Sequence, residues 1–307
     1  MRAFLRIVFL REEGMTLPKV IDDAARILPD EMAKAIYKMD EQRLENVEEI
    51  RLRMGFEPTV LSQGTEQAFL ADRRVTCVDL DTVLQRATMS SLHTAQDQLK
   101  HGFITTKGAV RIGVCGTVTI DGGISGIRDV SSLAVRVARQ VKGAGASTVS
   151  AIIQGRLSAL IISPPGGGKT TFLRELIRMT SQGGKRVSVA DERGELAAVY
   201  DGKPMFDVGG STDIMSFCPK AQGAMMLLRS MNPEVIALDE ITASEDVRAM
   251  KEIINCGVRL YATAHARSLD DLKKRPLYSE MLALGAFDCV VTISSQGKER
   301  RYEVMRI

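Results

Sequence analysis

The spacing of hydrophobic positions changes along the chain and predicts two domains. Residues 16–46 place apolar side chains at helical spacing, whereas Val47–Arg53 alternates apolar and polar positions like a half-buried strand. Further helical and strand-like segments follow as far as Lys100. From residue 151 onward, apolar runs typical of buried strands alternate with helical segments, and this order predicts a parallel sheet covered by helices.

The first of these domains is expected to combine helices with antiparallel strands. Segment Gly102–Arg139 is rich in β-branched residues and is interrupted by glycine-containing turns, which predicts hairpins. We therefore predict an α+β domain over residues 16–141, a flexible linker of small residues over 142–150 and a second domain over 151–307. The other elements expected in the first domain are strands over 58–62, 67–71 and 73–78 and helices over 79–89 and 91–100.

Composition sets further limits. A net charge of +3 over 307 residues is too small to indicate a nucleic-acid partner by itself, and no apolar run approaches the roughly 18 residues of a membrane span. The five cysteines form no CxxC pair, so we expect free thiols in a reducing compartment. Residues 1–15 begin with a short apolar run that carries arginines. We expect residues 1–14 to be an upstream extension that the fold does not use, with Met15 as the true start.

A glycine-rich loop lies between the first apolar run of the second domain and the helix after it. The run Leu157–Ile162 leads into SPPGGGKTT, the phosphate-binding P-loop pattern in its strand–loop–helix context, although Ser163 stands where its first glycine is usual. The glycines let backbone N–H groups surround phosphate oxygens. Lys169 would reach the β and γ phosphates, and the Thr170 hydroxyl would bind Mg²⁺. The residues expected to bind ATP are Pro165, Gly166, Gly167, Gly168, Lys169, Thr170 and Thr171.

An acidic pair follows a second buried strand. The apolar run Val235–Leu238 ends in Asp239-Glu240, and P-loop proteins that hydrolyse ATP need such a pair. Asp239 would hold the Mg²⁺ shell through water, and Glu240 would orient and polarise the attacking water, because phosphoryl transfer depends mainly on positioning and charge neutralisation. A strand that simply ends in exposed acids is the simpler interpretation, and the P-loop disfavours it.

Two further polar stretches also follow buried strands. Asp191–Glu195 (DERGE) and Thr263–Ala266 (TAHA) would lie at the carboxyl ends of parallel strands, where open α/β sheets bind their ligands. His265 is either a sensor of the γ-phosphate or a structural histidine, and the acidic stretch is either part of the site or a charged surface turn. The sequence leaves both alternatives open.

The order of these motifs resembles that of the secretion ATPase superfamily, the hexameric RecA-like motors of type II and type IV secretion and of pilus extension and retraction. The resemblance implies an α/β fold in which a RecA-like ATPase domain follows a smaller α+β domain, with ATP and Mg²⁺ as cofactors and a ring as the assembly. Thr242 departs from the pattern, because those motors usually carry arginine there. The residues that match it are Asp191, Glu192, Glu195, Arg229, Pro233, Glu234, Asp239, Glu240 and His265. Catalytic roles are expected for Lys169, Glu195, Arg229, Asp239, Glu240 and His265.

A narrower resemblance covers the first domain as well. Five segments together are similar to the stage III sporulation protein AA family, and the resemblance runs from about residue 16 to the end. They are Glu48–Arg53, Gly102–Gly116, Ser131–Arg139, Ser211–Glu240 and Gly257–Ala266. Membership implies a mother-cell ATPase in the cytoplasm of endospore-forming bacteria, which powers or regulates a channel complex between mother cell and forespore. The implied partners are membrane proteins, one of them similar to a secretion platform protein, through which the ATPase associates peripherally with the membrane.

Arginines are expected to complete the site, because in such rings a neighbour's arginine neutralises charge in the transition state. Arg136 and Arg139 of the first domain are the candidates for this role, whereas Arg193 and Arg229 could act within their own domain. Movement of the first domain about residues 142–150 would be the work output. Two other functions stay open: a nucleic-acid motor, which the absence of tryptophan and of a long basic run disfavours, and an ATP-binding switch, which the acidic pair disfavours.

Overall fold

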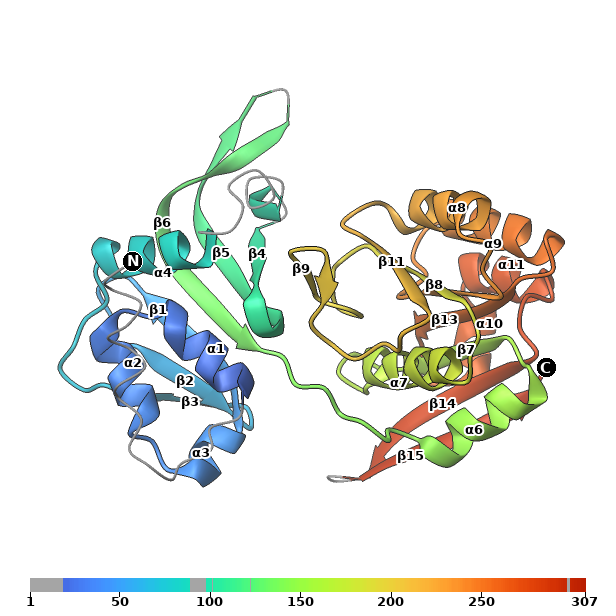
Figure 1. Ribbon diagram of the computed structural model, residues 1–307, viewed down its shortest axis with the longest axis horizontal. Helices are drawn as coiled ribbons and strands as arrows, with labels where there is room; N and C mark the ends of the chain where they lie inside the picture. Colours follow the sequence, from blue (N-terminus) through green and yellow to red (C-terminus); the bar gives the residue numbers. More distant parts are fainter. Residues whose placement is uncertain (1–18, 89–97, 101, 122, 297–298) are drawn as a thin grey trace. The chain divides into compact units, whose positions relative to one another are not determined.

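The chain folds as two compact units in the computed structural model, which describes residues 19–88, 98–100, 102–121, 123–296 and 299–307 (Figure 1). One unit comprises the described residues up to Arg139 together with 199–205, and the other comprises the described residues of 140–198 and 206–307. Among the residues that are described, no helix is long and apolar enough to cross a membrane. The extension expected over 1–14 and most of the helix expected over 91–100 lie outside them.

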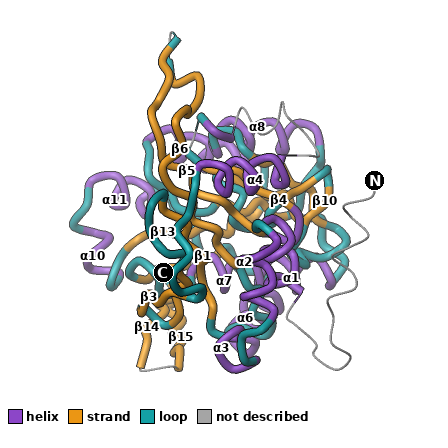
Figure 2. The backbone as a smooth tube through the Cα atoms, turned by 90° about the vertical axis from the view of Figure 1, so that its left-hand side faces the viewer, coloured by secondary structure: helices purple, strands orange, loops and turns teal. Residues whose placement is uncertain are grey.

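The first unit is built on a six-stranded sheet with the strand order β3-β2-β1-β6-β5-β4. All its neighbouring strands pair antiparallel, and β5 and β6 run together as one long ribbon (Figure 2). Its helices are α1 (Lys19–Ile27), α2 (Asp30–Tyr37), α3 (Glu41–Glu45) and α4 (Cys77–Thr88). Its strands are β1 (Val47–Arg53), β2 (Thr59–Ser62), β3 (Thr65–Ala68), β4 (Phe103–Thr106), β5 (Val110–Ile120) and β6 (Ile124–Val137).

The buried residues of this unit follow the predicted spacing of apolar positions. Ile50 and Leu52 of β1 are fully buried on one face, because alternate side chains of a strand point to the same side. Val135 of β6 is the register partner of both Ile50 and Ile112 of β5, so these three buried side chains form a row across the strands. Ile21 of α1 packs into the same core. The predicted α+β character and the antiparallel hairpins are confirmed.

The strand expected over 73–78 is wrong, because helix α4 begins at Cys77. The N–H of Thr76 donates to the Asp79 carboxylate at 2.7 Å, and the N–H of Asp79 donates to the Thr76 hydroxyl at 3.3 Å. These reciprocal bonds satisfy N–H groups that a helix start leaves unpaired, so they fix the start of the helix here. Val75 keeps an isolated bridge to Met54.

The second unit contains a seven-stranded sheet with the order β11-β8-β12-β13-β7-β14-β15. Its strands pair in parallel except β15, which is antiparallel to β14. The strands are β7 (Ala159–Ser163), β8 (Val187–Asp191), β11 (Thr212–Ser216), β12 (Val235–Leu238), β13 (Arg259–His265), β14 (Cys289–Gln296) and β15 (Glu299–Arg306). The helices are α6 (Ala146–Gly155), α7 (Lys169–Gln182), α8 (Lys220–Ser230), α9 (Ser244–Asn255), α10 (Leu269–Lys273) and α11 (Pro276–Ala283). A short hairpin, β9 (Val199–Tyr200) with β10 (Lys203–Pro204), belongs to the first unit by its contacts.

The parallel register brings the ends of four strands to one edge of this sheet. Ser163 at the end of β7 is the register partner of His265 at the end of β13. Leu238 at the end of β12 is the register partner of Ala190 in β8, so the aspartate that directly follows each of them reaches the same edge. The predicted parallel sheet is confirmed, whereas β11 and the two-stranded hairpin were not predicted.

Helix α6 corrects the expectation of a flexible linker over 142–150, since it begins at Ala146. Before it, Lys142 Nζ forms an ion pair with Asp207 at 2.8 Å. A β-carbon on Gly145 would lie 2.6 Å from the ring of Phe172. The small residues of this segment therefore allow close packing, and they do not provide a flexible hinge over its whole length.

Candidate functional site

The loop between β7 and α7 leaves the start of the helix open to an anion. Gly166 and Gly168 have φ values of 72° and 95°, in the region that favours glycine. The first N–H groups of a helix have no intrahelical acceptor, and at Gly168, the N-cap of α7, no side-chain cap bonds them either. A β-carbon on Gly167 would lie 2.3 Å from Ser163 Oγ. The serine at the usual glycine position is therefore accommodated because Gly167 has no side chain.

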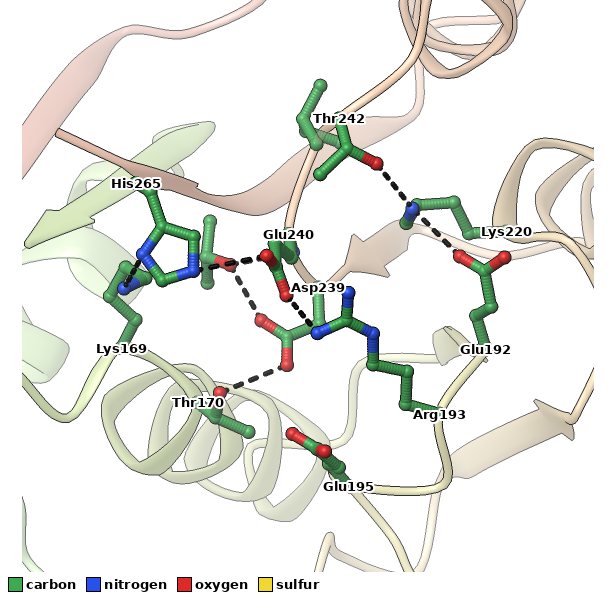
Figure 3. A network of polar contacts seen from close by, with 12 residues as sticks. Lys169, Thr170, Glu192, Arg193, Glu195, Lys220, Asp239, Glu240, Thr242 and His265 are labelled. Atoms are coloured by element: carbon green, nitrogen blue, oxygen red, sulfur yellow. Dashed lines mark hydrogen bonds and ion pairs between the residues drawn. The ribbon is translucent and has the colours of Figure 1, made fainter. Parts of the chain in front are cut away.

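Lys169 is folded against this loop. Its Nζ donates to the carbonyls of Ser163 at 3.1 Å and Pro164 at 3.2 Å, and it lies 2.9 Å from Nδ1 of His265 (Figure 3). Burial lowers the pKa of Lys169, and the charges of the acidic pair oppose that shift. Because an ammonium group only donates, Nδ1 of His265 accepts this hydrogen bond. The N–H of the imidazole ring is then at Nε2.

Asp239 lies between two threonine hydroxyls. Thr170 Oγ1 donates to Asp239 Oδ2 at 3.0 Å, and Thr263 Oγ1 donates to Oδ1 at 2.6 Å. Desolvation raises the pKa of Asp239, and these two hydrogen bonds oppose the rise. Within the described part of the chain, no salt bridge compensates this carboxylate. A desolvated carboxylate beside a hydroxyl suits Mg²⁺, which prefers oxygen ligands, so Thr170 and Asp239 fit the metal site that the sequence predicts.

Glu240 follows directly and is held from three sides. Its backbone has φ 57°, and its N–H donates to Thr263 Oγ1 at 2.7 Å. Its carboxylate lies 3.1 Å from His265 Nε2 and also pairs with the Arg193 guanidinium (Figure 3). Thr263 thus holds both acids of the pair, a role that the sequence analysis did not assign to it within the stretch Thr263–Ala266. Its position two residues before His265 on β13 could have revealed it, because both side chains then point to one face of the sheet.

The acidic stretch that begins at the end of β8 lies beside the acidic pair, since Arg193 within it pairs with Glu240. The Asp191 carboxylate accepts hydrogen bonds from the N–H groups of Glu195, Leu196 and Ala197, and desolvation raises its pKa. Asp191 therefore organises the turn. The Glu195 side chain lies on the side of the site where Thr170 lies (Figure 3), and its charge contributes to the raised pKa of Asp239.

Lys220 is a member of the cluster that sequence reasoning missed. Its Nζ lies 2.8 Å from Glu192 Oε2 and 3.5 Å from Thr242 Oγ1 (Figure 3). It also lies 3.4 Å from Asp246 Oδ2. It therefore connects the acidic stretch with the segment that follows the acidic pair. Lys220 begins helix α8, where the helix dipole disfavours a cation. A lysine at that position, directly after Pro219, was the available signal for a nearby anionic partner.

The arginines named from the sequence lie in different places. Arg193 forms an ion pair with Glu240 of the acidic pair. Arg229 is exposed in the last turn of α8, about 14 Å along the helix from Lys220, so it is not part of the cluster. In the first unit, Arg136 pairs with Glu49 at 3.1 Å and its side chain is 61% exposed. Arg139 donates to two backbone carbonyls of the same unit.

The chain is similar in sequence to a known family and to known proteins. The family described as "Sporulation stage III, protein AA" matches residues 20–305. The stage III sporulation protein AA of Bacillus subtilis (strain 168) is 36% identical over 281 residues, which cover 89% of this chain and 91% of that protein. The protein SEEDLING PLASTID DEVELOPMENT 1 of Arabidopsis thaliana is 32% identical over 187 residues, which cover 59% of this chain and 27% of that protein.

Solved structures share the fold. The ATPase DotB of Legionella pneumophila superposes with a TM-score of 0.58 at 19% identity, covering 91% of this chain and 80% of DotB. The pilus retraction motor PilT, solved with bound ADP, superposes with a TM-score of 0.59 at 16% identity, covering 86% of this chain and 81% of PilT. The fold is therefore that of the P-loop secretion ATPases, as the order of the sequence motifs predicted.

Proposed function

Because the chain belongs to the family described as sporulation stage III, protein AA, we propose that it is a magnesium-dependent ATP hydrolase that works as a secretion-type motor. One observation carries the proposal: the P-loop hydroxyl of Thr170 lies 3.0 Å from the carboxylate of Asp239, directly before Glu240. This contact supports the proposal, because it brings the loop expected to bind phosphate together with the two residues expected to bind Mg²⁺ and with Glu240, the carboxylate proposed to orient the attacking water.

The side chains of the cluster divide the work of phosphoryl transfer. The N–H groups at the start of α7 bind phosphate oxygens, and Lys169 exchanges its present carbonyl partners for the β and γ phosphates. Mg²⁺ held by Thr170 and Asp239 would neutralise charge on those phosphates. Glu240 orients the attacking water and accepts its proton, while His265, which touches both Lys169 and Glu240, responds to the γ-phosphate.

The active assembly in this proposal is a ring, with six subunits as the secretion motors imply. Arg136 is the better candidate for the neighbour's arginine, because its side chain is largely exposed and one carboxylate orients it. Arg139 is less available, since its guanidinium bonds the backbone of its own unit. Sedimentation velocity with ATP and the rate per subunit against protein concentration test the ring. Arg136→Ala should abolish the concentration-dependent rate, whereas Arg128→Ala, at a 68% exposed side chain of the same unit, should not.

The proposed biological role is to power or regulate the channel complex between mother cell and forespore. The similarity to the Bacillus subtilis protein supports this role. The protein would act in the mother-cell cytoplasm and reach the membrane through its membrane-protein partners. Pull-down by those partners with ATP, and its loss in Lys169→Ala, would support the assignment.

Phosphate release from ATP tests the hydrolase proposal. Wild-type protein should release phosphate with Mg²⁺, and activity should vanish with EDTA and in Lys169→Ala. Binding of ATP without any turnover, alone and with the membrane partners, would favour an ATP-binding switch instead. Strong stimulation by single-stranded DNA would favour a nucleic-acid motor.

A further inference from the structure

Arg300 lies against the P-loop, although neither the P-loop motif nor the side-chain cluster described above includes it. A β-carbon on Gly168 would come within 2.9 Å of Arg300 Cζ and Nη1. The guanidinium therefore packs on the backbone of the last loop glycine, one residue before Lys169. Arg300 belongs to β15, more than a hundred residues further along the chain, so local sequence patterns could not connect the two.

Stacked rings hold this strand over the helix that follows the loop. Tyr302 of β15 stacks on Phe172 of α7, with ring centroids 5.2 Å apart and an interplanar angle of 29°. Because alternate side chains of a strand share a face, Arg300 and Tyr302 point to the same side of β15. The stacking therefore fixes the side of β15 that faces α7, and it places Arg300 at the start of that helix.

Arg300 has no anionic partner within the described part of the chain. Its side chain is exposed, and among the residues that are described no ion pair or hydrogen bond engages it. Its neighbour Arg301 points to the opposite face of β15 and pairs with Glu303 at 3.2 Å. An uncompensated guanidinium on the backbone of a phosphate-binding loop is positioned for a charge-assisted hydrogen bond to phosphate.

We propose that Arg300 is a further nucleotide-binding residue, whose guanidinium contacts the α- and β-phosphates of the bound nucleotide. This assignment rests on the proposed binding of ATP at the P-loop. The backbone around Gly168 belongs to the part of a P-loop that surrounds the α- and β-phosphates, whereas the lysine after it reaches toward the γ-phosphate. Arg300 therefore stabilises ATP and ADP alike, and it does not select between them.

Calorimetric titration with Mg-ATP and Mg-ADP tests the assignment, with Arg301→Ala as the matched control. Arg300→Ala should weaken both nucleotides about ten- to a hundredfold, the range for a hydrogen bond to a charged group. Arg300→Lys should recover part of this loss, and Arg301→Ala should bind like wild type. Equal affinities for Arg300→Ala and Arg301→Ala would overturn the assignment. Since Arg300 is exposed, both variants should keep the circular dichroism spectrum and melting temperature of the wild type.

Pyrophosphate distinguishes a phosphate contact from a contact with the base or ribose. Pyrophosphate has no nucleoside, so Arg300→Ala should weaken pyrophosphate binding by the same factor as ADP binding. If ADP binding falls while pyrophosphate binding is unchanged, the phosphate assignment is wrong. Binding needs no hydrolysis, so nucleotide binding that depends on Arg300 in a protein without turnover would contradict the proposed hydrolase function and leave this inference standing. If the wild-type protein binds neither ATP nor ADP, both the proposed function and this inference are wrong.

Discussion

Lys169 Nζ and His265 Nδ1 lie 2.9 Å apart, and the other nitrogen of the same ring lies 3.1 Å from a carboxylate oxygen of Glu240. His265 thus connects the lysine expected to bind phosphate with the acid expected to activate water. In this arrangement the Lys169 ammonium is bonded to two loop carbonyls and to His265. A nucleotide must compete for the lysine, and the histidine is placed to couple that exchange to Glu240.

Replacement of His265 by alanine should lower kcat much more than ATP affinity. The variant loses the positioning of Glu240, while the backbone N–H groups and the lysine still bind phosphate. We expect kcat to fall about a hundredfold and the dissociation constant for ATP to change by less than about threefold. Steady-state kinetics and titration with a fluorescent ATP analogue measure the two quantities. A large loss of affinity at unchanged kcat would assign the histidine to ground-state binding.

Arg193→Gln should slow hydrolysis. Arg193 pairs with Glu240, and in the proposed cycle it neutralises negative charge within its own domain. We expect kcat to fall at least about tenfold, with little change in ATP binding. The matched control is Arg186→Gln, because Arg186 pairs with Glu234 away from the cluster. If Arg193→Gln hydrolyses ATP faster than wild type, the ion pair with Glu240 inhibits hydrolysis and the proposed role of Arg193 is wrong.

Buried parallel strands were the part of the fold that sequence predicted best. They read as short apolar runs because both faces are covered, which is why β7, β12, β13 and the segment before Asp191 were found close to their observed bounds. Strand β11 (Thr212–Ser216) was missed, because it lies at the sheet edge and all its residues are only partly buried. The predicted strand over 73–78 failed because the capping bonds of Thr76 and Asp79 outweigh β propensity.

Site residues were predictable where the loop or strand end itself carries the signal. The P-loop, Asp239, Glu240 and His265 come together as the strand order requires. Lys220 and Arg300 could not be placed in this way, because each reaches the site from an element whose position depends on the sheet order and on packing. Arg229 matches a motif of the superfamily but lies at the far end of α8 from the cluster.

Lys220→Met should destabilise the second unit. The change removes the only cation bonded to the Asp246 carboxylate among the described residues, and Asp246 is almost fully buried. We expect a loss of about 1–3 kcal/mol in the free energy of unfolding. Urea denaturation measures it, with Lys251→Met on the exposed side of α9 as the control. Equal midpoints for the two variants would show that the Lys220 network does not contribute to stability.

Cys289 should resist alkylation in the folded protein. The side chain is buried, and burial raises the pKa of its thiol to about 11. At pH 8 only about one molecule in a thousand would carry the reactive thiolate. Brief treatment with iodoacetamide followed by mass spectrometry should modify exposed Cys256 and spare Cys289, and urea should remove the difference. Rapid modification of Cys289 without urea would contradict its burial beside Ser158.

The rate of phosphate release by Glu240→Gln, measured together with its ATP affinity, tests whether the Glu240 carboxylate activates the attacking water. The amide keeps the size of the side chain but cannot accept a proton from water. We expect wild type to hydrolyse Mg-ATP, the variant to be at least about a hundredfold slower, and the ATP affinity of the variant to stay within about threefold of wild type. Hydrolysis by Glu240→Gln at the wild-type rate would contradict the role of this carboxylate and of the cluster built around it.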